Sequence, residues 1–274
     1  MMADKEVSLT VIKATGILWI IGRAGRDLEF VEIVRESKLP KTVCYRLLHT
    51  LESERLVERN PDNGRFRIGP GLIELAGSAI GRNALRNQAS RKLAELARLT
   101  GDAVLLFIPY GRYAMCIDRF DGDCPVKPAG VEIGGLLPIH CGGAPFTILS
   151  HLPEPEVDAI LAGPLTRMTP RTVTDPDRIR RNMAEVRAQG YAVGDEDAVE
   201  YVVAVGAPIF GGNHQVIGAL SIGGIKPRYG DERITEIITH VRKAAEELTM
   251  ALGHARPATA DERRAADRGH ARLA

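Results

Sequence analysis

The sequence predicts an α+β protein of two domains, a small helical one followed by a larger one built around an antiparallel sheet. The chain has 274 residues, which is enough to bury two separate hydrophobic cores. Residues 28–69 hold two short amphipathic helices and a hairpin. Beyond residue 84, β-prone runs are separated by helical ones and several are joined as hairpins, which is typical of α+β domains.

Composition and charge narrow the class of protein. Hydrophobic residues make up 45% of the chain and charged residues 26%, and the net charge is +1. Residues 1–82 carry 13 Lys/Arg against 11 Asp/Glu, whereas residues 83–252 carry 18 against 21. A polyanion such as DNA therefore meets no global positive field, so any contact with it must be local and in the first domain.

Nothing in the sequence indicates a membrane or a secreted protein. No apolar run reaches about 18 residues, and no signal peptide opens the chain. The four cysteines form no Cys-x-x-Cys pair. We expect a reduced, cytoplasmic protein with no membrane partner, no metal and no cofactor.

The first helix is expected at Val7–Gly22. It is apolar nearly all round, so we expect it to be buried, either on the following helix pair or at a dimer contact. Trp19 is assigned to the core.

The two helices that follow form a pair with a short break. The second, Pro40–Glu54, begins with proline, which loses nothing at a first helical position. Its expected buried stripe is Val43, Leu47, Leu48 and Leu51, and the opposite face carries Thr42, Tyr45, Arg46 and His49, with Lys41 leading in. The preceding helix, 28–39, is apolar on one side. The break between the two helices, Ser37–Pro40, is short, so the helices must pack at an angle. This is the helix-turn-helix arrangement, with the second helix in the reading position.

A hairpin follows the helix pair. Two β-prone runs flank Pro61-Asp62-Asn63-Gly64, a strong turn signal. Phe66 and Ile68 share one face of the second strand, and Arg65 and Arg67 share the other. A hairpin with arginines beside a reading helix is the wing of a winged helix. We therefore expect Thr42, Tyr45, Arg46 and His49 to face the DNA major groove, with Lys41, Arg65 and Arg67 on phosphate or minor groove; the alternative is a small helical domain with solvated charges.

The rest of the chain reads as a connector and a second domain. Gly69-Pro70-Gly71 is expected to be a hinge before a connector helix. Asp175-Pro176 should start a helix that Gly190 ends. The other elements are expected as helices at 85–99, after 144 and at 231–252, and strands at 103–109, 113–119, 136–139, 202–209 and 216–222. The tail from Gly253 has no apolar stripe and is expected to be disordered.

Ordered motifs carry a resemblance to the IclR family of bacterial transcription regulators over residues 8–250. They are Leu39-Pro40-Lys41-Thr42, Tyr45-Arg46-Leu47-Leu48, Phe66-Arg67-Ile68-Gly69-Pro70, Leu137-Pro138-Ile139-His140-Cys141, Thr169-Pro170-Arg171-Thr172-Val173-Thr174-Asp175, Gly190-Tyr191, Ala207-Pro208-Ile209-Phe210 and Gly218-Ala219-Leu220-Ser221-Ile222. The resemblance implies a winged helix-turn-helix domain at 1–70, a linker helix at 71–84, a GAF-like effector-binding domain at 85–252 and a tail at 253–274. It also implies a palindromic double-stranded operator and a homodimer or a dimer of dimers.

The resemblance also implies a pocket for a small metabolite, often a carboxylate. The residues that it assigns to the effector are His140, Cys141, Gly143, Ala144, Gly194, Ala204, Ser221 and Gly223. Backbone N–H groups at the helix start after Gly142 suit a carboxylate. Family members that bind small keto acids have polar residues in place of Gly194, Ala204 and Gly223. We therefore expect an organic acid with an apolar or aromatic body.

Other readings remain open from the sequence. His140, Cys141 and the acidic loop Asp195–Glu200 could serve an enzyme, although no hydrolase or metalloprotease motif occurs. A metabolite-binding adaptor would be favoured if Arg46 and the hairpin arginines were blocked by packing. His140 could equally be a core histidine, Cys141 a small buried hydrophobe, and the acidic loop a solvated segment. The sequence does not decide between repression and activation.

Overall fold

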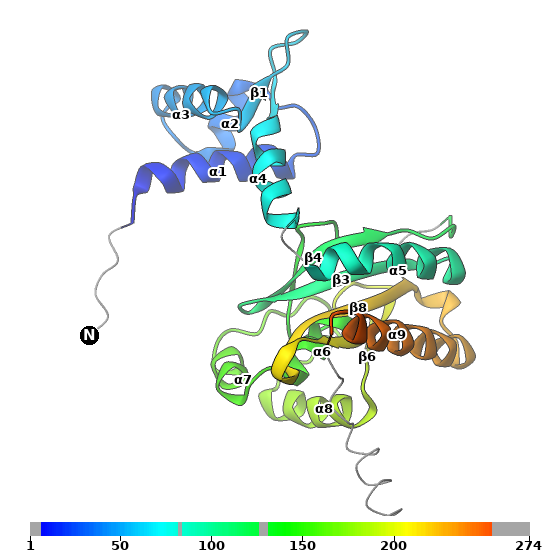
Figure 1. Ribbon diagram of the computed structural model, residues 1–274. Helices are drawn as coiled ribbons and strands as arrows, with labels where there is room; N and C mark the ends of the chain where they lie inside the picture. The colour runs from blue at the N-terminus through cyan, green and yellow to red at the C-terminus, as the bar shows by residue number, and fades with distance from the viewer. Residues whose placement is uncertain (1–6, 82–83, 126–130, 254–274) are drawn as a thin grey trace, which may run out of the picture. The chain divides into compact units, whose positions relative to one another are not determined.

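The computed structural model describes residues 7–81, 84–125 and 131–253, and the chain divides into two compact units at Arg82/Asn83 (Figure 1). Each unit has its own hydrophobic core. The predicted disorder of residues 254–274 lies outside the described residues.

The first unit is the predicted helix pair and hairpin, flanked by two more helices (Figure 1). Its elements are α1 (Leu9–Arg23), α2 (Phe30–Ser37), α3 (Lys41–Ser53), β1 (Val57–Arg59), β2 (Phe66–Ile68) and α4 (Pro70–Gly81). Glu29 and Glu32 form a capping box at the start of α2, and Lys38 ends that helix in the left-handed conformation at φ 56°. The turn after Lys38 is thus short, which sets α3 at an angle to α2.

The buried side of α3 differs from the prediction by one position. Cys44, Leu48 and Leu51 are the buried residues, at i, i+4 and i+7, whereas Val43 and Leu47 are half-buried. Cys44 is fully buried in the core of this unit. A cysteine behaves as a small hydrophobe, and the predicted stripe had passed over it.

The prediction for α1 was wrong within this chain. Only Ile17 and Ile21 are buried in the helix, and Trp19 is 62% exposed, with the Arg23 guanidinium 5.3 Å from its ring centre. Val11 and Ile12 are exposed as well. The assignment of Trp19 to the core therefore fails, and an apolar face of α1 stays uncovered.

The glycines before α4 are packed tightly rather than free to hinge. An added Cβ would lie 2.3 Å from the Arg55 carbonyl oxygen at Gly69 and 2.8 Å from it at Gly71. The N–H of Gly69 donates to Leu56 O, and that of Gly71 to Arg55 O. The expected hinge is therefore a fixed joint between α4 and the chain before β1, and glycine is needed there for close approach.

The second unit is built on a six-stranded antiparallel sheet with the order β5-β4-β3-β8-β7-β6. The strands are β3 (Ala103–Tyr110), β4 (Tyr113–Phe120), β5 (Leu136–Pro138), β6 (Ala192–Asp195), β7 (Val202–Phe210) and β8 (Val216–Ile225). The helices are α5 (Ala84–Thr100), α6 (Gly143–His151), α7 (Glu154–Leu161), α8 (Pro176–Gln189) and α9 (Asp231–Ala251), with single 3-10 turns η1 (Gly212–His214) and η2 (Lys226–Arg228). The predicted α+β class and antiparallel sheet are confirmed.

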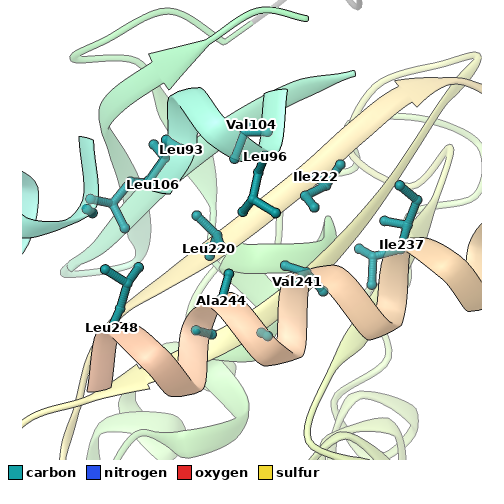
Figure 2. Close-up of a cluster of buried hydrophobic side chains, with 14 of the residues drawn as sticks. Leu93, Leu96, Val104, Leu106, Leu220, Ile222, Ile237, Val241, Ala244 and Leu248 are labelled. Carbon is teal, nitrogen blue, oxygen red and sulfur yellow. The ribbon is translucent and has the colours of Figure 1, made fainter. Parts of the chain in front are cut away.

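Each face of the sheet is covered by its own helices. Figure 2 shows α5 and α9 packed on one face, with Leu96, Leu220 and Val241 among the buried side chains. A second cluster joins α6, α7 and α8 to the opposite face through residues such as Phe107 and Ile148. The sheet therefore separates two cores, and the start of α6 lies on the second face.

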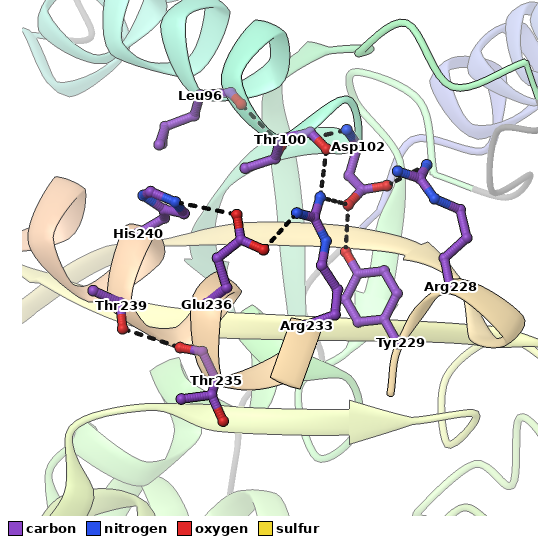
Figure 3. A network of polar contacts seen from close by, with 10 residues as sticks. All are labelled: Leu96, Thr100, Asp102, Arg228, Tyr229, Arg233, Thr235, Glu236, Thr239 and His240. Atoms are coloured by element: carbon purple, nitrogen blue, oxygen red, sulfur yellow. Dashed lines mark hydrogen bonds and ion pairs between the residues drawn. The ribbon is translucent and has the colours of Figure 1, made fainter. Parts of the chain in front are cut away.

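A buried carboxylate ties the ends of α5 and α9 to the sheet. Figure 3 shows Asp102, at 2% exposure, accepting hydrogen bonds from Tyr229 Oη at 3.1 Å and Arg233 Nη2 at 2.8 Å. Arg228 Nη1 lies 2.8 Å from the other carboxylate oxygen as an ion pair, without hydrogen-bond geometry. Two segments far apart in sequence, the one between α5 and β3 and the one at η2 and the start of α9, are thus joined at one charge.

Among the described residues, no helix has the length and hydropathy needed to cross a membrane.

Candidate nucleic-acid interface and ligand cavity

The outer face of α3 presents the predicted set of polar side chains. Lys41, Thr42, Tyr45, Arg46 and His49 are all exposed. The Tyr45 ring, 61% exposed, meets the Phe30 ring of α2 edge-on, with centroids 6.2 Å apart. Within the described part of the chain the Arg46 side chain has no hydrogen bond or ion pair. The helix thus offers a free cation and several hydrogen-bonding groups to a partner.

The hairpin arginines are exposed but paired. Arg65 Nη2 lies 2.8 Å from Glu29 Oε1, and Arg67 pairs with Glu58, its cross-strand neighbour. All four side chains are more than a third exposed, so each pair contributes at most about 1 kcal/mol. A phosphate can therefore replace either glutamate at little cost.

A third arginine on the hairpin was missed by the sequence reasoning. Arg59 Nε donates to Gly64 O at 3.0 Å, and its guanidinium lies over the Phe66 ring at 5.6 Å. Arg59 fixes the loop between β1 and β2. Its cross-strand pairing with Phe66 follows from the hairpin register and could have been anticipated from it.

In the second unit, the sheet register brings most predicted effector residues to one place. Gly194 pairs with Ala204, and Ala204 pairs with Gly223, so the three lie in a row across β6, β7 and β8. Ser221 pairs with Gly206, two residues further along β7 and β8 and therefore on the same face. Ala204 is therefore the direct cross-strand neighbour of both Gly194 and Gly223.

Helix α6 begins directly against this row. A Cβ added at Gly143 would lie 2.6 Å from Ala204 O, and one added at Gly206 would lie 2.3 Å from Ala144 N. Gly143, Ala144 and Ala204 thus meet through their backbones, with no space for an additional atom. The hydroxyl of Ser221, a residue only 3% exposed, faces the same side and has no hydrogen bond within the described residues.

The two predicted polar residues before α6 are buried. His140, at 5% exposure, donates from Nε2 to Thr166 O at 3.1 Å, and burial lowers the pKa of its imidazole. Cys141 is fully buried, and burial raises the pKa of its thiol. The two do not form a nucleophile and base, because the thiol is kept protonated and out of contact with solvent.

A cavity of about 310 Å³ lies between α6, α8 and β6. His140 is the one predicted effector residue that lines it, beside Gly142 and Asp197. The described residues around it are His140, Gly142, Phe146, Val173, Ile179, Asn182, Glu185, Val186, Gln189, Tyr191, Ala192, Val193 and Asp197. Polar groups and apolar walls are both present, as in small-molecule sites.

The sequence reasoning placed Asp197 in the acidic loop and not beside the start of α6. Its Oδ2 accepts a hydrogen bond from the Gly142 N–H at 2.9 Å, at the start of α6. Burial raises the pKa of this carboxyl group, and backbone N–H donors oppose that rise. An added Cβ at Gly194 would lie 2.8 Å from Asp197 Oδ1, so the carboxylate uses space that a side chain at 194 would need. The glycine at 194 was the available signal.

The acidic loop is therefore not simply solvated. Lys226 Nζ lies 2.5 Å from Asp195 Oδ1 and 2.8 Å from Glu196 Oε1, and Arg171 Nη1 lies 2.8 Å from Asp195 Oδ2. These ion pairs lower the pKa of Glu196. Among the described residues, no group of three His, Cys, Asp or Glu side chains is placed to hold a metal.

Two family models match the chain. The model described as the IclR helix-turn-helix domain matches residues 10–61, and the one described as the bacterial transcriptional regulator IclR C-terminal matches residues 77–250. Together they cover the helix pair with part of the hairpin, and the whole of the sheet.

Curated relatives and solved structures agree with these matches. The HTH-type transcriptional regulator XynR of Escherichia coli K12 is 30% identical over 89% of this chain and 97% of its own length. The IclR structure from Thermotoga maritima has a TM-score of 0.77 at 28% identity, covering 89% of this chain and 99% of that one. An IclR homolog from Microbacterium hydrocarbonoxydans, solved with 4-hydroxybenzoate, has a TM-score of 0.77 at 23% identity, covering 89% of this chain and 98% of that one.

Proposed function

Because the chain belongs to the IclR family of bacterial transcriptional regulators, we propose that it is a one-component regulator whose operator binding is controlled by a small organic acid. The first unit would bind the operator and the second unit the effector. The observation that carries the proposal is the exposed outer face of α3, where Arg46 is free of intramolecular partners within the described residues.

The docking that we propose uses the two elements differently. Thr42, Tyr45, Arg46 and His49 would contact base edges in the major groove, because a helix fits there and these side chains can read the edges. Lys41, Arg65 and Arg67 would contact phosphate or minor groove. The local charge of the hairpin and α3 supplies the attraction that the near-neutral chain lacks as a whole.

Binding to DNA from the chain's own upstream region tests this docking. Arg46→Ala should cost about 1–3 kcal/mol and relax specificity at one base position. Arg65→Ala should weaken binding to all sequences alike and reduce the salt dependence. Arg91→Ala, whose side chain is 92% exposed on α5, is the matched control and should change nothing. If both interface variants behave like the control in fluorescence anisotropy, the proposed docking is wrong.

For the effector, we propose an organic acid with an apolar or aromatic body. The row Gly194, Ala204 and Gly223 presents no polar side chain, which supports an apolar ligand surface there. Ser221 supports a polar anchor, because its hydroxyl makes no hydrogen bond within the described residues. His140, Cys141, Gly143 and Ala144 remain the proposed surroundings of the acid group.

Ser221→Ala is a sharp test of this site. The hydroxyl has no partner to lose, so the melting temperature should stay unchanged while effector affinity falls. Gly143→Val, in contrast, would collide with Ala204 O and disturb the unit itself. Titration of 4-hydroxybenzoate and of pyruvate, each followed by thermal shift, compares the two ligand sizes. Tighter binding of the keto acid would contradict the size argument.

The two other readings are less well supported by the geometry. An enzyme would need a reactive group at His140 or Cys141, and Cys141 is buried with a raised pKa. An adaptor would be favoured by arginines blocked in packing, yet Arg46 and the hairpin arginines are exposed. If the protein bound neither DNA nor an effector and turned over a metabolite, the enzyme reading would be favoured instead.

A further inference from the structure

We propose that Glu29 and Glu58 are built-in competitors of the DNA backbone. Each holds one hairpin arginine in the free protein, and a phosphate must displace it before that arginine can bind DNA. The two glutamates thereby set the absolute affinity of the first unit for DNA and its dependence on salt. The inference rests on the proposed function, because it names the residues that tune the same interface.

The first support is that the hairpin arginines and the glutamates are paired one to one. Arg65 Nη2 donates to Glu29 Oε1 at 2.8 Å, and Arg67 Nε donates to Glu58 Oε1. Glu29 directly precedes α2 and Glu58 lies on β1, so each partner comes from a different element. Neither arginine therefore presents an unpaired charge to a phosphate.

The second support is that the backbone places both carboxylates. Glu29 is the N-cap residue of α2, and its side chain also accepts the Glu32 N–H in the capping box. Glu58 is the cross-strand neighbour of Arg67 in the hairpin register, and side chains in such pairs lie close together. The two pairs thus follow from a helix cap and a strand register.

The third support is the contrast with the outer face of α3. The side chains of Lys41, Arg46 and His49 make no hydrogen bond or ion pair within the described residues. Acidic partners are thus found on the hairpin arginines and not on the cations of the reading helix. Contacts to phosphate carry no direct sequence information, so the cost of displacement falls on the sequence-blind part of binding.

Arg65 lies near a second carboxylate that is less easily displaced. Arg26 donates to both carboxylate oxygens of Glu32, at 2.6 and 3.2 Å. This hydrogen bonding lowers the pKa of Glu32 to about 2, and the charge of Arg65 contributes to the lowering. Glu32 is therefore ionised at neutral pH and engaged by Arg26, which leaves Glu29 as the partner that a phosphate exchanges.

The exchange is weak enough for DNA to win it. All four paired side chains are more than a third exposed, so water screens each pair, and breaking one lowers the affinity for DNA by up to about fivefold. The freed carboxylate then lies near the phosphates and repels them. Duplex DNA offers a dense row of phosphates and can overcome both costs, but with less affinity than unpaired arginines would give.

Glu58→Gln and Glu29→Gln test the proposal, because glutamine removes the charge and keeps an oxygen that can accept the capping N–H. Each variant of the full chain should bind its upstream DNA and a random-sequence duplex more tightly by the same factor, about 2–10-fold, in fluorescence anisotropy. The plot of log affinity against log salt should become steeper by up to about 0.9 per variant, since no freed carboxylate retains a cation. Unchanged affinity and slope in both variants would overturn the proposal.

A double-mutant cycle separates competition from plain repulsion. Glu58→Gln should tighten DNA binding more in the wild type than in Arg67→Gln, because only the wild type has an arginine to set free. The same holds for Glu29→Gln with and without Arg65. Equal effects in the two backgrounds would show that the glutamates act only as distant charges, and would overturn the proposal.

The matched control is Asp62→Asn. Asp62 is an exposed carboxylate at the tip of the same hairpin, and its side chain makes no hydrogen bond or ion pair in the described part of the chain. Its neutralisation relieves repulsion only, so its effect on DNA binding should be the same with Arg67 as without it. Coupling between Asp62 and Arg67 as large as that between Glu58 and Arg67 would overturn the proposal.

Three further outcomes keep the test decisive. If one glutamine variant does not fold, the other, on a different element, carries the test alone. A changed ratio of affinities for upstream and random DNA would overturn the sequence-blind role. A wild type that binds no DNA would overturn the proposed function together with this inference, whereas DNA binding that neither variant alters would overturn the inference alone.

Discussion

At the scale of single residues, Asp102 is the most deeply buried charged side chain among the described ion pairs of the second unit. Its side chain is 1% exposed, whereas those of Arg228 and Arg233 are 35% and 23% exposed. The arginines therefore keep part of their hydration while the carboxylate depends on its partners. Removal of the carboxylate takes one acceptor from Arg233, the acceptor from the Tyr229 hydroxyl, and the counter-charge from Arg228.

Asp102→Ala should accordingly lower the free energy of unfolding by roughly 2–4 kcal/mol, below the full loss of a buried pair because the arginines reach water. Tyr229→Phe removes one hydrogen bond only and should cost about 1 kcal/mol. Urea denaturation measures both. Equal costs for the two variants would mean that the charge itself contributes nothing.

Buried His140 and half-buried His151 predict a pH dependence. Burial lowers the pKa of His140 and of His151, while in the unfolded chain each titrates near about 6.5. Below that value the unfolded state takes up protons that the folded state does not, so the free energy of unfolding should fall as pH drops from about 7 to 5. The double variant His140→Gln, His151→Gln should flatten this slope in urea denaturation. An unchanged slope would assign the effect to other groups.

At the scale of elements, α1 is a helix whose outer face has no partner in the chain. Val11, Ile12 and Trp19 are 59%, 52% and 62% exposed. Neighbouring exposed apolar side chains mark association surfaces. We expect α1 to contribute to a homodimer, which would place two α3 helices on half-sites about 34 Å apart.

Charged substitutions on the exposed face of α1 test whether this helix forms the dimer contact. Val11→Glu with Ile12→Lys should shift the protein towards monomer in light scattering and weaken binding to a two-half-site operator. Val31→Glu, at a 63% exposed valine on α2, is the control and should leave the dimer intact. A wild-type monomer at operator-binding concentrations would refute the expectation.

Two glycines of the first unit should respond in opposite directions. Gly16 lies within α1 with no atom within 4 Å of an added Cβ, so Gly16→Ala should stabilise by about 0.5–1 kcal/mol. Gly69→Ala places a Cβ 2.3 Å from Arg55 O and should destabilise by about 1–3 kcal/mol. Thermal unfolding of the two variants checks the signs, and a stabilising Gly69→Ala would show that the joint before α4 is loose.

Elements were predictable from the sequence where the signal comes from residues that are adjacent in the chain. The start of α8 at Asp175-Pro176 and its end at Gly190 were predicted correctly, because capping depends on residues adjacent in the chain. The burial of Cys44 and the exposure of Trp19 were not, because both depend on which helix packs on which. Asp197 was beyond local reasoning, since its partner Gly142 lies in a different element.

At the scale of the whole molecule, two units with separate cores should unfold separately. Calorimetry should show two transitions, and residues 83–274 expressed alone should fold. Gly69→Ala should move one transition and Asp102→Ala the other. A single cooperative transition that both variants shift would show that the units depend on each other for stability.

The contact between Asp197 and the Gly142 amide has a consequence for the order in which the second unit can fold. Helix α6 has 9 residues, and its N-cap glycine has no side chain with which to cap the first turn. A helix this short is marginal in isolation. Its acceptor comes from a segment 55 residues later in the chain, so we expect α6 to become stable only after that segment has docked.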